Sequence, residues 1–408
     1  MDSLTQVVLG AAVWEAVLGR RVGNRAMVWG GIAGTLPDLD VLSGLVTDPM
    51  SALAYHRAFT HSISFAVLAA PLLGLTVHRI YGGRTYALQR RRLFYPLILL
   101  AFWVLLVMGS YLMPIPVFGI PAIAAVMTLV FGAMCGAVGA WDWWRGSTPR
   151  VPTVGAGGWT ILFFAAIVTH PLLDCFTSYG TQLLQPFTAL RVAWNTVSVV
   201  DPLYTLPFLL LLLIAAFRGR GTRVRRRLNT AGLVVSSAYL LLTAVNHYRV
   251  GTVLDDTLRQ RGLAANRSVL GPTLGNNLLW TGTAQVSDDT FYVGQYSILD
   301  REPVFSPFTP VAGHRGLLVP YREDRGMEIL RWFTQDYYMV RPGEAGTVTL
   351  SDLRYGALGD DPTVADAYLF TWQIDTTVRP VRVMQREMDF GGDRQTMLSD
   401  LWKRLLGN

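Results

Sequence analysis

Apolar and polar positions divide the chain into two parts of different character. Before residue 250, apolar stretches of about 20 residues recur between short polar segments, and an α-helix needs this length to cross the hydrocarbon core of a bilayer. Two shorter stretches rich in Gly and Ala predict helices packed inside a bundle, because small residues allow helices to approach closely. The predicted spans are 62–80, 94–113, 117–141, 159–176, 201–217 and 229–248, and the shorter pair is 3–18 and 26–37.

From about residue 250 onward, apolar and polar residues alternate instead. Segments such as 290–296, 346–350 and 368–374 show a period of two, which predicts half-buried antiparallel strands. About 150 residues are enough for one independent hydrophobic core. We therefore predict a polytopic α-helical membrane domain of about six to eight helices over residues 1–249, followed by a β-rich α+β domain over residues 250–408.

Composition supports the membrane class. Of the 408 residues, 51% are hydrophobic and 15% are charged, whereas soluble domains typically carry roughly 25% charged residues. The net charge of +7 rests on arginine, since Lys403 is the only lysine. The arginines lie in short runs between apolar segments, as they do in cytoplasmic loops of membrane proteins. This distribution argues against a nucleic-acid partner.

The arginine runs also predict the orientation in the membrane. Runs within 79–92 and 218–227 mark cytoplasmic loops by the positive-inside rule. Counting spans from these loops puts Asp38, His61 and Asp174 on the opposite face, together with everything after residue 250. We predict a multi-pass protein of a bacterial-type inner membrane with an extracytoplasmic C-terminal domain.

Three short motifs place ionisable residues in this apolar background. They read Pro37-Asp38-Leu39-Asp40, His56-Arg57-Ala58-Phe59-Thr60-His61 and His170-Pro171-Leu172-Leu173-Asp174. Ionisable side chains at a bilayer are costly, so their default interpretation is functional. Imidazole nitrogen and carboxylate oxygen are ligands of catalytic zinc and related ions. The motifs therefore predict a divalent metal on the extracytoplasmic face.

Each motif alone also has a structural interpretation. His170 and Asp174 lie four residues apart, on one face of a helix, but Pro171 between them kinks that helix. Asp38 and Asp40 repel each other unless a cation lies between them, yet they also suit an exposed acidic turn that caps the next helix. The histidine pair of the second motif is harder to explain by packing.

Further polar residues are candidates for substrate binding. Arg57 can orient a phosphate through its guanidinium group, and Arg191 lies in the predicted external loop 177–200. Gln6 lies at the external end of the first helix. Glu15 either bonds a neighbouring helix or feeds a proton path, and His247 is a reserve ligand.

Together the motifs resemble the signature of the YdjM-type family of membrane-bound, metal-dependent hydrolases. The resemblance covers roughly residues 1–215 and extends to Thr177-Ser178-Tyr179-Gly180-Thr181 and Gln185-Pro186-Phe187. The chain departs from the family pattern where Ala58 replaces a common glycine and where Gln6 stands in place of a frequent histidine. The resemblance implies that the metal ligands and catalytic residues are Asp38, Asp40, His56, His61, His170 and Asp174.

Motifs and resemblance together predict a metal-dependent hydrolase that holds one or two divalent ions, most plausibly zinc. Such an ion lowers the pKa of a bound water toward about 7 and polarises the scissile group. A site at the membrane surface favours an amphiphilic substrate, a phospholipid or another lipid-linked phosphate ester. Two alternatives stay open: an envelope assembly protein with a structural metal, and a metal-binding transporter, against which the absence of an internal repeat argues. The oligomeric state is left open.

Overall fold

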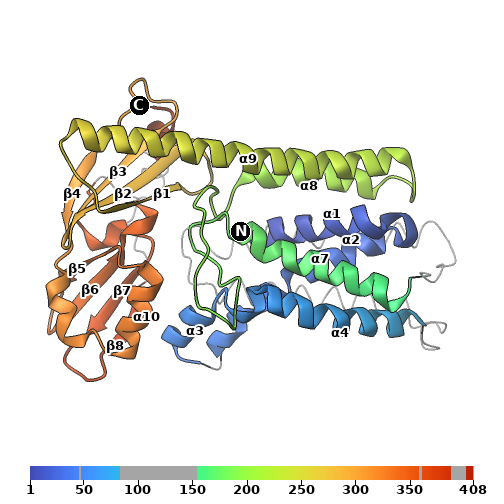
Figure 1. The fold of residues 1–408 in the computed structure, drawn as a ribbon, viewed down its shortest axis with the longest axis horizontal. Coiled ribbons are helices and arrows are strands. Elements are labelled where there is room, and N and C mark those ends of the chain that lie inside the picture. Colours follow the sequence, from blue (N-terminus) through green and yellow to red (C-terminus); the bar gives the residue numbers. More distant parts are fainter. Residues whose placement is uncertain (46, 83–153, 358–360, 387–400, 408) are drawn as a thin grey trace.

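The computed structural model describes residues 1–408 except 46, 83–153, 358–360, 387–400 and 408. A bundle of long helices forms one end of the molecule, and a sheet-rich C-terminal domain forms the other (Figure 1). A predominantly helical N-terminal part and a sheet-rich C-terminal part were both expected from the apolar pattern, and both are confirmed. The predicted spans 94–113 and 117–141 lie outside the described residues.

The first two helices form a tight hairpin at the centre of the bundle. Helix α1 (Ser3–Val22) and helix α2 (Asn24–Thr35) are joined by Gly23, whose φ of 70° allows the reversal. A side chain at Gly10 would clash with the carbonyl oxygen of Gly30, and one at Gly34 would meet the backbone of α1. The Gly-rich helices therefore approach closely, as predicted from their composition.

The remaining helices of the bundle correspond to four of the predicted spans. Helices α4 (Ile63–Gly82) and α7 (Ala156–Asp174) lie side by side, and helix α8 (Pro202–Ala216) lies against α9 (Arg223–Gln260). A hydrophobic core that contains several aromatic residues joins α1, α2, α4 and α7. Its largest fully buried members are Trp14, Trp159, Leu162, Phe163 and Ile167.

Length and composition qualify two of the described helices, α7 and α9, to cross a membrane. A third candidate consists of residues Pro49–His61 and Ile63–Arg79, which meet at an angle of 61°. Helix α8 is apolar but shorter. Two or three clear spans are thus found among the described residues, and the predicted total of six to eight helices stays a prediction.

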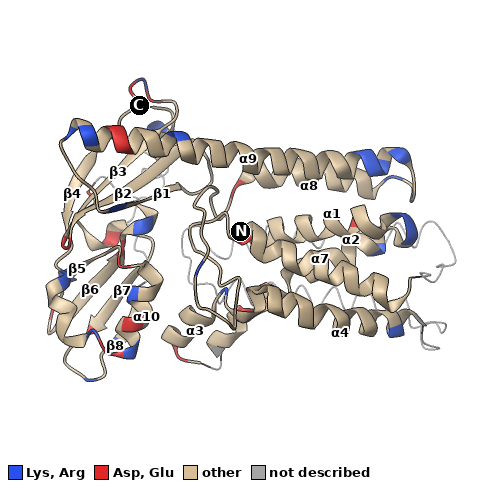
Figure 2. Cartoon of the chain, in the orientation of Figure 1, with Lys and Arg blue, Asp and Glu red and all other residues tan. Residues whose placement is uncertain are grey.

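Charge is distributed unevenly along the bundle. Arginines gather at the end of the bundle that lies away from the C-terminal domain, on α1, α4 and α9 (Figure 2). At this end, Arg225 of α9 is buried and donates to both carboxylate oxygens of Glu15 at 2.6 Å. Glu15 therefore bonds a neighbouring helix, the first of the two roles expected for it.

Helix α9 connects the two parts of the molecule without a break. It begins at Arg223 in the bundle and continues past the predicted domain boundary at 249 to Gln260 (Figure 1). Its last turns bury Val250, Leu254 and Leu258 against the first sheet of the C-terminal domain. The boundary predicted between residues 249 and 250 thus falls inside a continuous helix. The apolar residues of α9 that we expected to face lipid are followed directly by apolar residues that pack on the first sheet, so the helix continues across the boundary.

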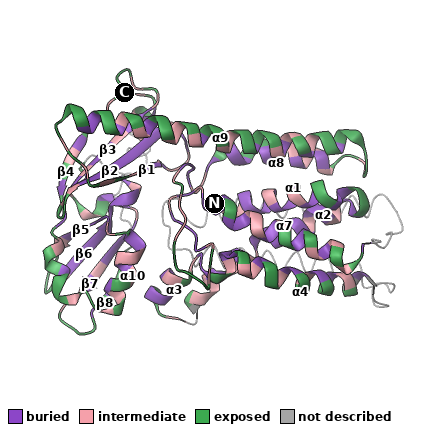
Figure 3. Ribbon diagram, viewed as in Figure 1, coloured by how far each residue is buried: buried purple, intermediate pink, exposed green. Residues whose placement is uncertain are grey.

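The C-terminal domain contains two antiparallel four-stranded sheets in which sequential strands are neighbours. Strands 290–296, 346–350 and 368–374 were predicted, and they correspond to β3, β6 and β7. The two middle strands of each sheet are mostly buried (Figure 3). The first sheet is β1 (Arg267–Pro272), β2 (Leu279–Ser287), β3 (Thr290–Ser297) and β4 (Phe308–Ala312); the second is β5 (Tyr338–Pro342), β6 (Thr347–Asp352), β7 (Thr371–Asp375) and β8 (Arg382–Arg386).

Helix α3 (Pro49–Tyr55) joins the bundle to the second sheet. Met50 and Leu53 of α3 are buried in the same core as Phe333 of α10 (Arg325–Thr334) and Val383 of β8. Tyr179, from the segment after α7, belongs to this core as well. The chain segments that carry the sequence motifs are therefore held between the helices and the C-terminal domain.

Candidate metal centre

The DxD motif lies on a tight turn where the α1–α2 hairpin ends. Helix α2 stops at Thr35, and Pro37 opens a 3-10 helix, η1 (Pro37–Leu45), with both carboxylates in its first turn. Asp40 points toward the second motif and accepts a hydrogen bond from the backbone N–H of Arg57 at 2.6 Å. Asp38 accepts one from the Ser3 hydroxyl at 3.5 Å. The two carboxylates thus face different partners.

The two histidines closest to each other are His61 and His170. His61 lies in a short 3-10 helix, η2 (Phe59–His61), and His170 on the last turn of α7. The Nδ1 of His61 lies 3.2 Å from an Asp40 oxygen, and the Nδ1 of His170 bonds the carbonyl oxygen of Gly34. Both Nδ1 atoms therefore face acceptors, and each ring turns its Nε2 into the site.

The two Nε2 atoms are 3.1 Å apart in a fully buried position. If both Nδ1 atoms carry protons, two nitrogen lone pairs would face each other across this gap. A positive charge has to lie between them, either a proton on one imidazole or a metal cation. Metal-bound histidines typically donate the N–H of their second ring nitrogen to a carboxylate or a backbone carbonyl. Here the Asp40 carboxylate is the acceptor for His61, and the Gly34 carbonyl oxygen is the acceptor for His170.

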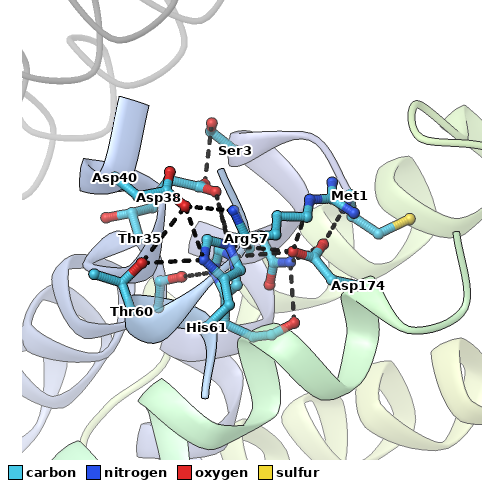
Figure 4. Close-up of polar contacts among 12 residues, drawn as sticks. Met1, Ser3, Thr35, Asp38, Asp40, Arg57, Thr60, His61 and Asp174 are labelled. Atoms are coloured by element: carbon cyan, nitrogen blue, oxygen red, sulfur yellow. Dashed lines mark hydrogen bonds and ion pairs between the residues drawn. The ribbon is translucent and has the colours of Figure 1, made fainter. Parts of the chain in front are cut away.

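Two carboxylate oxygens complete the arrangement (Figure 4). Asp38 Oδ1 lies 3.6 Å from His61 Nε2 and 3.3 Å from His170 Nε2, and Asp174 Oδ2 lies 3.4 Å from each of the same nitrogens. A tetrahedral zinc with bonds of about 2.0–2.1 Å separates its ligand atoms by about 3.3–3.4 Å. The five separations that involve the imidazole nitrogens, 3.1–3.6 Å, fit such an ion. Ligand atoms of Asp38, His61 and His170 all lie within 4.8 Å of one another, and Asp174 Oδ2 borders this group through the two nitrogens.

Unpaired atoms support the same interpretation. Asp174 Oδ2 is fully buried and has no hydrogen-bond partner, although its other oxygen accepts from Gln6 Nε2 at 3.0 Å and from the α-amino group of Met1. A buried carboxylate oxygen without a partner costs free energy, and a bound cation removes that cost. The donor set of two imidazoles and two carboxylates suits zinc and related divalent ions.

Asp40 and His56 lie next to this cluster rather than in it. His56 Nδ1 lies 3.1 Å from Asp40 Oδ1, and the His56 ring packs on Tyr179 with centroids 5.0 Å apart. Burial by itself would raise the pKa of Asp40, but the charges and hydrogen bonds of His56 and His61 outweigh it and hold the pKa of this carboxyl below its usual range. Both residues were predicted as ligands of the ion, and that role stays a prediction. In the structure Asp40 contacts His61 Nδ1, and His56 contacts Asp40.

This arrangement predicts different effects for the two aspartates of η1. We expect Asp40→Asn to weaken metal binding about 10- to 100-fold, because it disturbs the acceptor of His61 without removing a ligand. Excess zinc should restore full occupancy in this variant. Asp38→Ala, which removes a carboxylate of the cluster, should resist the same rescue. Titration of the metal-free variants with zinc measures both affinities; equal behaviour of the two would contradict the assignment.

Arg57 is the substrate-binding candidate that the structure places at the cluster. It is 5% exposed and adopts a φ of 56°, donates to the Thr177 hydroxyl at 2.9 Å, and rests on the ring of Tyr179. Its Nε lies 3.4 Å from Asp174 Oδ2 and makes no hydrogen bond. Gln6, the second candidate, contacts Asp174, and its Oε1 is also unpaired. Both side chains therefore have free polar atoms at the cluster.

Arg191 occupies a different place. Its guanidinium group donates to the carbonyl oxygens of Phe333 and Tyr179 and lies over the rings of Tyr179, Trp332 and Phe333, at 4.6–5.0 Å from their centroids. Burial, together with the nearby charge of Arg354, lowers the pKa of Arg191 to about 10. Its contacts join the loop after α7 to the C-terminal domain and give no support to the predicted role in substrate binding.

One further expectation, a reserve ligand role for His247, can be compared with the structure. His247 packs on Trp280 of the first sheet, with ring centroids 5.8 Å apart, and does not take part in the cluster. The carbonyl oxygen of Gly34, which accepts from His170, was not anticipated. Its only signal in the sequence was the Gly-rich composition of α2, since a backbone acceptor leaves no residue type to recognise.

A comparison of the sequence with models of protein families identifies the family of this chain. The model of the family described as YdjM inner membrane protein matches residues 1–116 and 120–250. The chain belongs to this family. The match includes the residues that converge on the cluster, and it confirms the resemblance recognised in the motifs. Association of the YdjM family with the inner membrane agrees with the apolar helices described above.

The YdjM match ends within α9, so the C-terminal domain from β1 onward lies beyond it. No curated protein and no solved structure matches the chain. The function of this YdjM-family member has to be argued from the cluster itself.

Proposed function

We propose that the protein is a membrane-bound, metal-dependent hydrolase whose centre consists of Asp38, His61, His170 and Asp174. The observation that carries this proposal is the convergence of two imidazole nitrogens and two carboxylate oxygens at 3.1–3.6 Å in a buried position. A divalent ion held there would supply Lewis-acid chemistry and activate a water molecule. Zinc is the ion we favour.

The residues around the centre suggest how a phosphate ester is bound. Asp38 is the most open of the four ligands, with a side chain 13% exposed, whereas the side chains of the other three are fully buried. A substrate therefore approaches on the side of Asp38. The Arg57 guanidinium, anchored by Thr177, can donate to a phosphoryl oxygen. Asp40 can accept a hydrogen bond from the Nδ1–H of His61 and so keep that proton on the ring during turnover.

The proposal includes the orientation of the protein in the membrane. Arginines gather at the end of the bundle away from the metal centre, and the positive-inside rule makes that end cytoplasmic. The centre and the C-terminal domain then lie on the extracytoplasmic side. A centre at this depth favours a phospholipid or another lipid-linked phosphate ester as the substrate.

One observation favours a second candidate, a non-catalytic protein in which the metal is structural. Four side chains of the protein converge on the centre, and if all four were ligands the ion would have no open position, whereas catalytic zinc sites keep one open. In this case the ion would join η1, η2 and α7 and fix the surface on which the C-terminal domain rests. Hydrolysis instead requires that Asp38 yields its place or that the ion takes a fifth ligand, as catalytic zinc does in some transition states.

The two candidates predict different results with defined substrates. We expect the zinc-loaded protein to hydrolyse bis(4-nitrophenyl) phosphate or vesicles of phosphatidylglycerol, and His170→Ala to lose this activity along with the metal. Phosphate or alcohol release measures turnover. Stoichiometric zinc without hydrolysis of either ester, combined with a marked loss of thermal stability on chelation, would overturn the hydrolase proposal and favour the structural role.

A further inference from the structure

We propose that Phe59, Ile63, Leu184 and Phe187 form an acyl-chain surface, which holds the hydrocarbon chain of a membrane lipid while its headgroup lies at the metal centre. This inference rests on the proposed hydrolase function and specifies its substrate as a lipid taken directly from the bilayer. The surface combines residues from two segments distant in sequence, the start of α4 and the loop that follows α7 (Figure 1).

Backbone hydrogen bonds fix these two segments against each other. The N–H of Ile63 donates to the carbonyl oxygen of Leu183 at 3.0 Å, and the N–H of Gln182 donates to that of Arg57 at 2.9 Å. The Gln182 side chain adds a bond to the carbonyl oxygen of Ala54 at 3.0 Å. The loop therefore lies directly over the segment that carries Arg57 and His61, and the apolar side chains of both segments share one surface.

These side chains are far more exposed than apolar residues usually are. Phe187 is 87% exposed, Leu184 47%, Phe59 42% and Ile63 37%. Exposed apolar side chains on two hydrogen-bonded segments, with no cover among the described residues, mark an interaction site rather than a face turned to water. The family places this protein in a membrane.

Continuity with α4 identifies the occupant as lipid. The first turns of α4 expose Val67, Leu68 and Leu72 by 53–70%, and this helix belongs to a candidate membrane span. Phe59 contacts Phe65 of the same helix with ring centroids 6.0 Å apart. The acyl-chain surface thus continues the apolar side of α4 toward the metal centre.

The acyl-chain surface lies close enough to the metal centre for one amphiphilic molecule to reach both. Phe59 and His61 belong to one turn, η2, so the acyl-chain surface begins two residues from a metal ligand. Arg57, which can bind a phosphoryl oxygen, lies on the same segment. A lipid with its chain on Phe59 and Phe187 can therefore present a phosphate near its headgroup to Arg57 and the ion. A soluble phosphate ester makes no use of the apolar surface.

Photo-crosslinking tests the surface independently of catalysis. The full-length protein carries a benzophenone amino acid at position 187, in vesicles of phosphatidylethanolamine and phosphatidylglycerol. The control is the same group at Val319, which is 61% exposed but lies in the C-terminal domain. We expect lipid adducts at 187 and few at 319. Folded protein without lipid adducts at 187, or with equal adducts at both positions, would overturn the proposal.

Kinetics test the link to the substrate. Because Phe187→Ser removes the largest apolar contact with an acyl chain, it should raise the KM for phosphatidylglycerol vesicles about tenfold more than the KM for bis(4-nitrophenyl) phosphate. Val319→Ser should leave both values unchanged. An equal effect of Phe187→Ser on the KM for the two esters would overturn the assignment of this surface to the acyl chain of the lipid. If the wild type hydrolyses neither ester, the hydrolase proposal fails, and crosslinking still decides whether lipid occupies the surface.

Discussion

Replacing His61 with alanine is expected to abolish stoichiometric metal binding. The imidazole supplies one of four donors in a cluster in which the side chains of His61, His170 and Asp174 are fully buried, and its loss leaves the carboxylates of Asp38 and Asp174 with only the His170 imidazole beside them. We expect an affinity loss of more than about a hundredfold, beyond the range seen when only a supporting residue is changed. Metal analysis of the detergent-purified protein by mass spectrometry measures the effect.

The matched control for this experiment is His78→Ala. His78 lies on α4, the helix that begins beside His61, but its Nδ1 lies 3.2 Å from the carbonyl oxygen of Val154, away from the cluster. We expect this variant to keep the metal content of the wild type. Metal retained by His61→Ala, or a wild type that binds no divalent ion after reconstitution with zinc, would contradict the assignment of the centre.

Replacing Tyr179 with alanine is expected to destabilise the protein and weaken its metal centre together. The Tyr179 ring is 7% exposed and lies between His56 and Arg57 on one side and Phe333 and Phe370 on the other. Truncation of a buried aromatic side chain typically costs about 3–5 kcal/mol. The cavity lies directly beside Arg57 and His56, so their positions loosen and zinc affinity falls as well.

Tyr179→Phe separates the ring from its hydroxyl group. This variant keeps the aromatic contacts, and we expect stability and zinc affinity close to those of the wild type. Thermal unfolding in detergent and zinc titration provide the two readouts. A Tyr179→Ala variant that loses stability but binds zinc with unchanged affinity would show that the C-terminal domain does not support the centre.

Much of the fold follows from the sequence because periodicity reflects burial. The helices containing His170 and Glu15 and the strand 290–296 were predicted from apolar patterns alone, and the structure confirms them. The end of α9 was not predictable in this way. Its apolar residues pass from the bundle to the first sheet without a break in helical periodicity, so the pattern contains no boundary.

The candidate site shows a similar division. Residue types and spacing singled out every side chain of the cluster, because ionisable groups are rare in this apolar background. The sequence did not separate Asp38 from Asp40, two residues apart on one turn. That distinction depends on which carboxylate faces the Nε2 atom of a histidine and which faces an Nδ1 atom. The orientation of the His170 ring is set by the carbonyl oxygen of Gly34 and by the packing of α7 on the α1–α2 hairpin.

Because helix α9 is continuous from the bundle to the first sheet, a change in its tilt in the bilayer would be transmitted to the C-terminal domain. At 1.5 Å per residue its 38 residues extend about 57 Å, so a change in tilt of about 10° displaces one end relative to the other by about 10 Å. Membrane helices adjust their tilt to the thickness of the surrounding hydrocarbon. Because the far end of α9 is buried against the first sheet, such an adjustment would act as a lever on the C-terminal domain and, through Arg191 and Tyr179, on the loop beside the metal centre.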